Sequence, residues 1–147
     1  MVSSMTVEQI SIFLENKAGR LAEVTDLLAR QNVNIRALSL ADTSDFGILR
    51  LIVNDPVAAL AVLKDNGFTV ARNEIVAVLL PDRPGGLAGV LAALKGRNVN
   101  VEYMYAFVQR SEGNAVVIFR FDETAAAVDV LKGAGIRMLS SAEIQTL

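Results

Sequence analysis

The chain has 147 residues, of which 52% are hydrophobic, so it can form one ordinary domain or two small ones that each bury a core. Its net charge of −2 leaves no broad positive field for a phosphate backbone, and no apolar run approaches the roughly 18 residues that span a bilayer. Cysteine and histidine are absent, which excludes disulfides, thiolate chemistry and the commonest general base. We therefore expect a cytoplasmic protein with no nucleic-acid partner, no membrane partner, no metal site and no cofactor.

The first half of the chain predicts six elements in the order strand, helix, strand, strand, helix, strand. Residues 7–14 alternate polar and apolar side chains, which is typical of a strand with one buried face. Leu21, Val24 and Leu28 recur at three- and four-residue steps and predict a helix that runs to about residue 31. The other four elements are strands 35–41 and 48–53, joined by a turn at 43–47, a helix from Asp55-Pro56 to Gly67, and a short strand 68–71.

The second half repeats this order. Asn32-Val33-Asn34-Ile35 aligns with Asn98-Val99-Asn100-Val101 at an offset of 66, and Gly67 aligns with Gly135 at an offset of 68. A tandem duplication follows, with predicted domains at 1–73 and 74–147. The second copy predicts strand 75–80, helix 85–95, strand 101–108, a turn at 111–114, strand 115–121, helix 122–132 and strand 136–139.

The repeated order predicts an α+β fold with two ferredoxin-like βαββαβ domains in tandem. Right-handed crossovers place both helices of a domain on one face of an antiparallel four-stranded sheet. Residues 75–80 have no polar position, so we expect the other face to be covered too, by a second sheet or a second chain.

A glycine-bearing turn between the first strand and the first helix occurs in both halves. A helix N-terminus preceded by glycine offers unpaired N–H groups and a partial positive charge, which suit a carboxylate. The alternative is that the glycines only permit a tight turn. The two turns are Asn16-Lys17-Ala18-Gly19-Arg20-Leu21 and Asp82-Arg83-Pro84-Gly85-Gly86-Leu87.

Four polar side chains near these turns have two interpretations each. Asn16 and Asp82 stand at equivalent positions and either receive a ligand's ammonium group or cap the helix. Asn34 and Asn100 begin the second strands and either reach the ligand or satisfy a structural turn.

With these features, the chain resembles a tandem pair of ACT domains, which are small-molecule-sensing modules of amino-acid metabolism. The resemblance rests on the turn at 82–87, on the run at 98–101 and on the repeated element order; the first copy departs by having Asn16 and Ala18. It implies that a regulatory amino acid binds where two domains pair edge to edge, with the turns at the seam. It also implies a link to an enzyme that the domains regulate.

We predict a regulatory protein, a homodimer or higher homo-oligomer with a possible partner enzyme, that binds a free amino acid or close analogue and modulates amino-acid metabolism. The alternative is a ligand-free interaction module that uses its sheet to dimerise or to grip an enzyme. We expect no catalytic residue, because no paired carboxylates stand in a catalytic frame. The predicted ligand-binding residues are Asn16, Ala18, Gly19, Arg20, Leu21, Asn34, Asp82, Pro84, Gly85, Gly86, Leu87 and Asn100.

Overall fold

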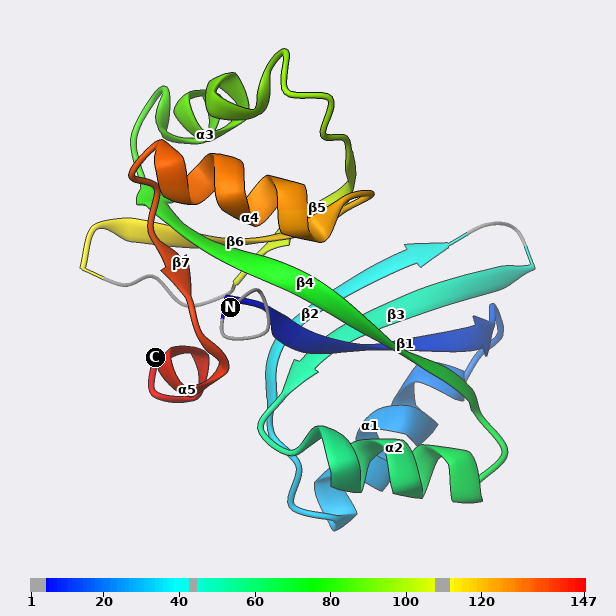
Figure 1. Cartoon of the computed structure of the whole chain (residues 1–147). Helices are drawn as coiled ribbons and strands as arrows, with labels where there is room; N and C mark the ends of the chain where they lie inside the picture. Colours follow the sequence, from blue (N-terminus) through cyan, green and yellow to red (C-terminus); the bar gives the residue numbers. More distant parts are fainter. Residues whose placement is uncertain (1–4, 43–44, 108–111) are drawn as a thin grey trace. The chain divides into compact units, whose positions relative to one another are not determined.

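A computed structural model describes residues 5–42, 45–107 and 112–147 (Figure 1). The chain divides into two compact units. The first unit is Glu8–Asn73, and the second unit is Glu74–Leu147 together with the described residues before Glu8. Thr43 and Ser44 of the first predicted turn, and the predicted strand end at 108, lie outside the described residues.

The first unit is a four-stranded sheet with the strand order β2-β3-β1-β4. Strand β3 pairs antiparallel with both β1 and β2. Its elements are β1 (Val7–Glu15), α1 (Arg20–Arg30), β2 (Ile35–Asp42), β3 (Phe46–Val53), α2 (Pro56–Asp65) and the first part of β4 (Thr69–Pro81). Helices α1 and α2 share a core with the same face of the sheet, which includes Ile12, Leu28, Leu49 and Leu63.

The second unit has the same arrangement, with the strand order β7-β4-β6-β5. Its elements are the remainder of β4, α3 (Gly86–Leu94), β5 (Val101–Ala106), β6 (Asn114–Phe121), α4 (Thr124–Gly133), β7 (Met138–Leu139) and α5 (Ser141–Gln145). Val78, Val90, Phe119 and Leu131 belong to its core. The predicted α+β fold with two ferredoxin-like copies is therefore confirmed.

The local signals read from the sequence explain the helix ends. The Asp55 carboxylate accepts a hydrogen bond from the Ala58 N–H at 3.1 Å, and Pro56 occupies the first turn of α2, where no N–H is needed. Asn32 and Asn98 both adopt a φ of 58°, a left-handed conformation that asparagine tolerates. Asn32 and Asn98, which are equivalent positions of the two copies, thus have the same unusual backbone conformation.

One boundary prediction was wrong. Strands 68–71 and 75–80 were predicted as separate elements, yet β4 is one strand of 13 residues. The polar residues between them stay in the strand because their side chains find partners on β1. Arg72 pairs with Glu8, and the Ser11 hydroxyl donates to the Asn73 side-chain oxygen Oδ1 at 2.7 Å. The polar side chains at these positions interrupt the apolar pattern and suggested the end of a strand, although the strand continues through them.

Two further differences concern the end of the chain. Strand β7 is shorter than the predicted strand 136–139, and helix α5 was not predicted. Helix α5 begins with a capping box, in which the Glu143 N–H donates to the Ser140 hydroxyl and the Ser140 N–H donates to the Glu143 carboxylate. The Ser-x-x-Glu spacing was therefore a usable signal.

The sheet face away from the helices is buried in the second unit, as predicted. Ala77 and Ile118 are directly paired and fully buried, and their side chains point away from the core that Val78 shares with the helices. The identity of what covers this face, whether a sheet or a chain, stays a prediction.

Candidate functional site

The two strand-to-helix turns have the same backbone form. Gly19 and Gly85 are the N-cap residues of α1 and α3, with φ of 90° and 87°. In the second turn the Gly86 N–H donates to the Arg83 carbonyl oxygen at 3.0 Å, and in the first turn the Arg20 N–H donates to the Lys17 carbonyl oxygen at 3.4 Å. A side chain at Gly19 or Gly85 would be strained by its positive φ, so glycine suits both positions.

Gly86 is required for a different reason. A methyl group at this position would lie 2.0 Å from the Pro81 carbonyl oxygen, which belongs to the backbone. Helix α3 therefore starts in direct contact with the end of β4. At the equivalent position of the first unit stands Arg20, which carries a full side chain. The two turns share a backbone form and pack differently.

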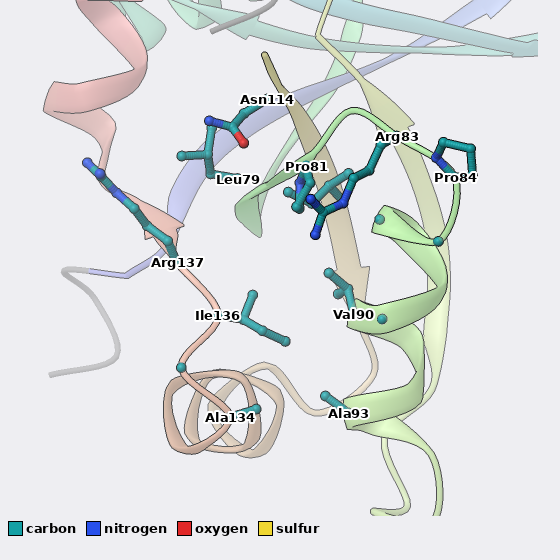
Figure 2. A pocket seen from close by; sticks show the side chains of 15 residues that line it. Leu79, Pro81, Arg83, Pro84, Val90, Ala93, Asn114, Ala134, Ile136 and Arg137 are labelled. Carbon is teal, nitrogen blue, oxygen red and sulfur yellow. The ribbon is translucent and has the colours of Figure 1, made fainter. Parts of the chain in front are cut away.

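A cavity of about 580 Å³ opens beside the second turn, entirely within the second unit (Figure 2). It lies between the start of α3, the end of β4, and the connection from α4 to β7. Figure 2 shows Arg83 on the side of the turn, Arg137 on the side of β7, and Val90, Ala93 and Ile136 along the wall. The other lining residues are Leu79, Leu80, Pro81, Pro84, Gly85, Gly86, Gly89, Asn114, Ala134 and Gly135.

The cavity lining carries positive charge. None of its residues is Asp or Glu. Arg137 Nη2 lies 2.6 Å from Glu143 Oε2, whereas Arg83 has no ion-pair partner in the part of the chain that the structure describes. A hydrogen bond from the Ser140 backbone, followed by one from Arg137, holds the pKa of Glu143 below its ordinary value. Glu143 is thus ionised and engaged, while the Arg83 guanidinium is left for a ligand or water.

At the equivalent place in the first unit, Arg20 contacts three of the chain's own side chains. Arg20 lies over the Phe68 ring with its guanidinium carbon 5.3 Å from the ring centroid. Its Nη2 lies 3.1 Å from Glu15 Oε1 and its Nη1 lies 3.0 Å from Glu23 Oε2. These contacts raise the pKa of Arg20, through Glu23 first, and hydrogen bonds from Lys17 and then Arg20 lower the pKa of Glu15.

The duplication relates this network to the cavity. By the offset of 66, Glu15, Arg20 and Glu23 correspond to Pro81, Gly86 and Gly89; by the offset of 68, Phe68 corresponds to Ile136. All four counterparts line the cavity. The second unit therefore has no arginine, carboxylate or aromatic ring at these four positions, and a cavity lies beside them.

The predicted ligand-binding residues divide into three groups. Pro84, Gly85 and Gly86 line the cavity; Asp82 and Leu87 belong to the same turn and do not line it. The equivalent turn in the first unit holds the second group, Asn16, Ala18, Gly19, Arg20 and Leu21.

Asn34 and Asn100 form the third group, and the structure does not bring them to the turns. Both stand near the C-terminal ends of α1 and α3, whereas the turns precede these helices. The Asn34 N–H donates to Asn54 Oδ1 at 2.8 Å and the Asn100 N–H donates to Asp122 Oδ1 at 2.9 Å. These hydrogen bonds engage the backbone N–H of each asparagine, so the role of the two side chains stays a prediction.

Sequence reasoning missed Asn114, Ile136 and Arg137. These residues reach the cavity because β6 and β7 pair with β4 on its two sides, with Pro81 opposite Asn114 and Val78 opposite Met138. In a ferredoxin-like domain the last strand lies beside the first, and this topology was the available signal.

This fold and this sequence match known proteins. Residues 5–147 match the family described as ACT domain pair. The chain belongs to this family. A protein from Bacteroides thetaiotaomicron, known from a crystal structure, is 43% identical with a TM-score of 0.92, and the match covers 99% of each chain. Among curated proteins, no sequence matches this ACT domain pair.

Two more distant structures share the fold. The regulatory subunit of aspartate kinase from Thermus thermophilus, in its ligand-free form, is 18% identical with a TM-score of 0.62, over 88% of this chain and 93% of that one. Aspartate kinase from Clostridium acetobutylicum is also 18% identical, with a TM-score of 0.52, over 86% of this chain and 32% of that one.

Residues 5–42, 45–107 and 112–147 include no helix long and apolar enough to cross a membrane. The same residues include no cluster of three or more carboxylates able to hold a metal ion.

Proposed function

We propose that this ACT domain pair binds a free amino acid or a close analogue in the cavity beside the turn at 82–87, and thereby regulates amino-acid metabolism. The observation that carries the proposal is the cavity itself, which adjoins a glycine-started helix and an arginine. Its volume of about 580 Å³ falls within the range of about 300–1,000 Å³ that is typical of small-molecule sites.

The residues of the cavity suggest how such a ligand is held. The N-terminal end of α3, with its partial positive charge, and the Arg83 guanidinium attract a carboxylate, and Gly85 and Gly86 let it approach the backbone. Val90, Ala93 and Ile136 offer apolar surface to the rest of the molecule. The bound ligand would link the turn to the α4–β7 connection, so it favours the conformation in which the two lie close.

The regulated target is proposed to be an enzyme on a separate chain. The Thermus thermophilus protein of this fold is a regulatory subunit of aspartate kinase, which supports a partner of this kind. The activity of candidate enzymes, measured with this protein in the presence and absence of the ligand, identifies the regulated enzyme and the direction of regulation.

Thermal unfolding measured with each common amino acid and its analogues tests the proposal. A ligand at one hundred times its Kd adds about 2.7 kcal/mol of stability, which moves the midpoint of a chain of this size by several degrees. Gly89 faces the cavity with open space around it, so Gly89→Glu fills the cavity without a backbone clash.

The matched control is Ala88→Glu, which adds the same charge to the same helix outside this cavity. We expect a ligand-dependent shift in the unaltered protein and in Ala88→Glu, and none in Gly89→Glu. If no compound shifts the midpoint of any of the three proteins, the proposal is wrong.

A second candidate function is that of an interaction module, and one observation favours it. Strand β2 ends the sheet of the first unit, and Leu38 and Leu40 on its helix side are 46% and 50% exposed. They pair with Leu51 and Leu49, which are buried under the helices. A second copy that pairs along β2 would cover the exposed side chains of Leu38 and Leu40.

Sedimentation at several micromolar concentrations tests this assembly. We expect a dimer that Leu40→Lys weakens at least tenfold. A monomer at all concentrations excludes the homo-oligomer, while ligand binding is judged separately by the thermal shifts.

A further inference from the structure

The cavity differs from a usual amino-acid site in the charges of its lining. An amino acid carries a carboxylate and an ammonium group, and a buried ammonium needs a carboxylate or several carbonyl acceptors nearby. The cavity provides two guanidinium groups, Arg83 and Arg137, and no Asp or Glu among its lining residues. Glu143 lies behind Arg137 and is engaged by it and by the Ser140 backbone.

The first unit shows how the equivalent charges are arranged when carboxylates are present. There Lys17 lies 3.4 Å from Glu15, and Arg20 bridges Glu15 and Glu23. In the second unit the cation is retained, because Arg83 stands where Lys17 stands, while both carboxylate positions hold Pro81 and Gly89. A group of cations balanced by carboxylates has become a group of cations around a cavity.

The remaining lining specifies the shape of the ligand's other end. Val90, Ala93 and Ile136 are apolar, and they line the part of the cavity between α3 and the α4–β7 connection (Figure 2). Among the described residues that line the cavity, only Asn114 has a neutral polar side chain, and its amide both donates and accepts. The cavity thus combines an anion-attracting end with an apolar wall.

We propose that the preferred ligand is an apolar monocarboxylate without an α-ammonium group, of the class of 2-oxo acids and simple branched or aromatic carboxylic acids. Its carboxylate lies at the turn beside Arg83, and its tail lies against Val90 and Ile136. An amino acid with the same tail binds less tightly, because its ammonium group lies near the Arg83 guanidinium and no carboxylate lines the cavity. The inference rests on the proposed function for the location of the site and adds the chemical class of the ligand.

Calorimetric titration with matched ligand series tests the class. The three series are alanine, pyruvate and propanoate; leucine, 4-methyl-2-oxopentanoate and 4-methylpentanoate; and phenylalanine, phenylpyruvate and 3-phenylpropanoate. Within each series only the α substituent changes, so the tail contributes equally. We expect at least one of the three series to bind, with each acid that lacks the ammonium group binding at least ten times more tightly than its amino acid.

Two variants locate the effect. Arg83→Gln should weaken the binding of the preferred acid at least tenfold, and the uncharged amide of that acid should not bind. The matched control is Lys17→Gln, which removes the equivalent charge in the first unit and should leave the affinity unchanged.

Each outcome of the titrations supports or contradicts one of the two proposals. If an amino acid binds as tightly as its 2-oxo acid or more tightly, this inference is wrong while the proposed function stands. If Lys17→Gln and Arg83→Gln have equal effects, the cavity is not the binding site, and the inference fails with it. If neither amino acids nor acids bind, both proposals fail.

Discussion

The turn at 16–21 and the turn at 82–87 have a common origin and different contents. Both start a helix from a left-handed glycine, yet the first unit places Arg20 over Phe68 between two carboxylates, and the second unit leaves a cavity at the same place. Duplication preserved the backbone because the strand-to-helix connection depends on glycine and on strand pairing. The side chains at four positions were free to diverge, and they determine whether the place is filled or open.

The largest effects should come from the two separate cores. Leu63 and Leu131 are equivalent and fully buried, one in each unit. Replacing either with alanine leaves a cavity and should lower the free energy of unfolding by about 2–5 kcal/mol. Amide hydrogen exchange should show the loss of protection mainly in the unit that carries the change. Equal loss in both units from either variant would show that the cores do not act separately.

The next effect distinguishes the two helix starts. Gly86→Ala places a methyl group 2.0 Å from a backbone oxygen and should destabilise the protein by about 1–3 kcal/mol in denaturant unfolding. Gly89→Ala, in the same helix with open space, should instead stabilise it by about 0.4–1 kcal/mol. Arg20→Ala at the equivalent position of the first unit introduces no new atom and should not reproduce the Gly86→Ala effect. Similar midpoints for Gly86→Ala and Gly89→Ala would contradict the close contact between α3 and β4.

A graft tests whether four positions account for the difference between the units. Glu15→Pro, Arg20→Gly, Glu23→Gly and Phe68→Ile together give the first unit the residues that line the cavity in the second. We expect calorimetric stoichiometry to rise from one ligand per chain to two, with the new site weaker because Thr69 stands where Arg137 stands. A folded variant, checked by circular dichroism, that still binds one ligand would mean that other residues form the site.

The smallest effect concerns pH. The pKa of Glu15 is lowered by Lys17 and Arg20, and the pKa of Glu143 by the Ser140 backbone and Arg137. Because both pKa values are lower in the folded state, the ionised forms stabilise the fold above the ordinary carboxyl pKa. That contribution is lost as pH falls through the folded-state values. Glu15→Gln and Glu143→Gln should each flatten the fall of the unfolding midpoint between about pH 6 and about pH 3.

Asp65→Asn is the control for this pH dependence, since it removes a carboxylate outside both ion-pair groups. A profile for Glu143→Gln that is as steep as that of the unaltered protein would show that the Arg137 contact is not maintained in solution. In that case Arg137 would be available to the cavity in the same way as Arg83.

The sequence by itself determined the repeated order of strands and helices as far as β7, the duplication, the two glycine turns and the family; helix α5 and the continuity of β4 were not predicted. These features depend on local sequence. The helix and strand patterns, the Asp-Pro helix start and the left-handed glycine and asparagine positions each involve only a few neighbouring residues. The equivalence of Asn32 and Asn98 is visible in the sequence, and in the structure both residues adopt the same φ.

Only the tertiary structure decided which parts of the turns face a cavity. Ile136 and Arg137 approach Gly86 because β7 pairs with β4, a contact across some sixty residues that no local pattern reveals. The predicted helix 85–95 already implied that Asn100 lies at the opposite end of the helix from the turn, and the structure places it after the C-terminal end of α3. The difference between a filled place and an open one depends on packing, since Arg20 reaches Phe68 only when the sheet and helix hold them 5.3 Å apart.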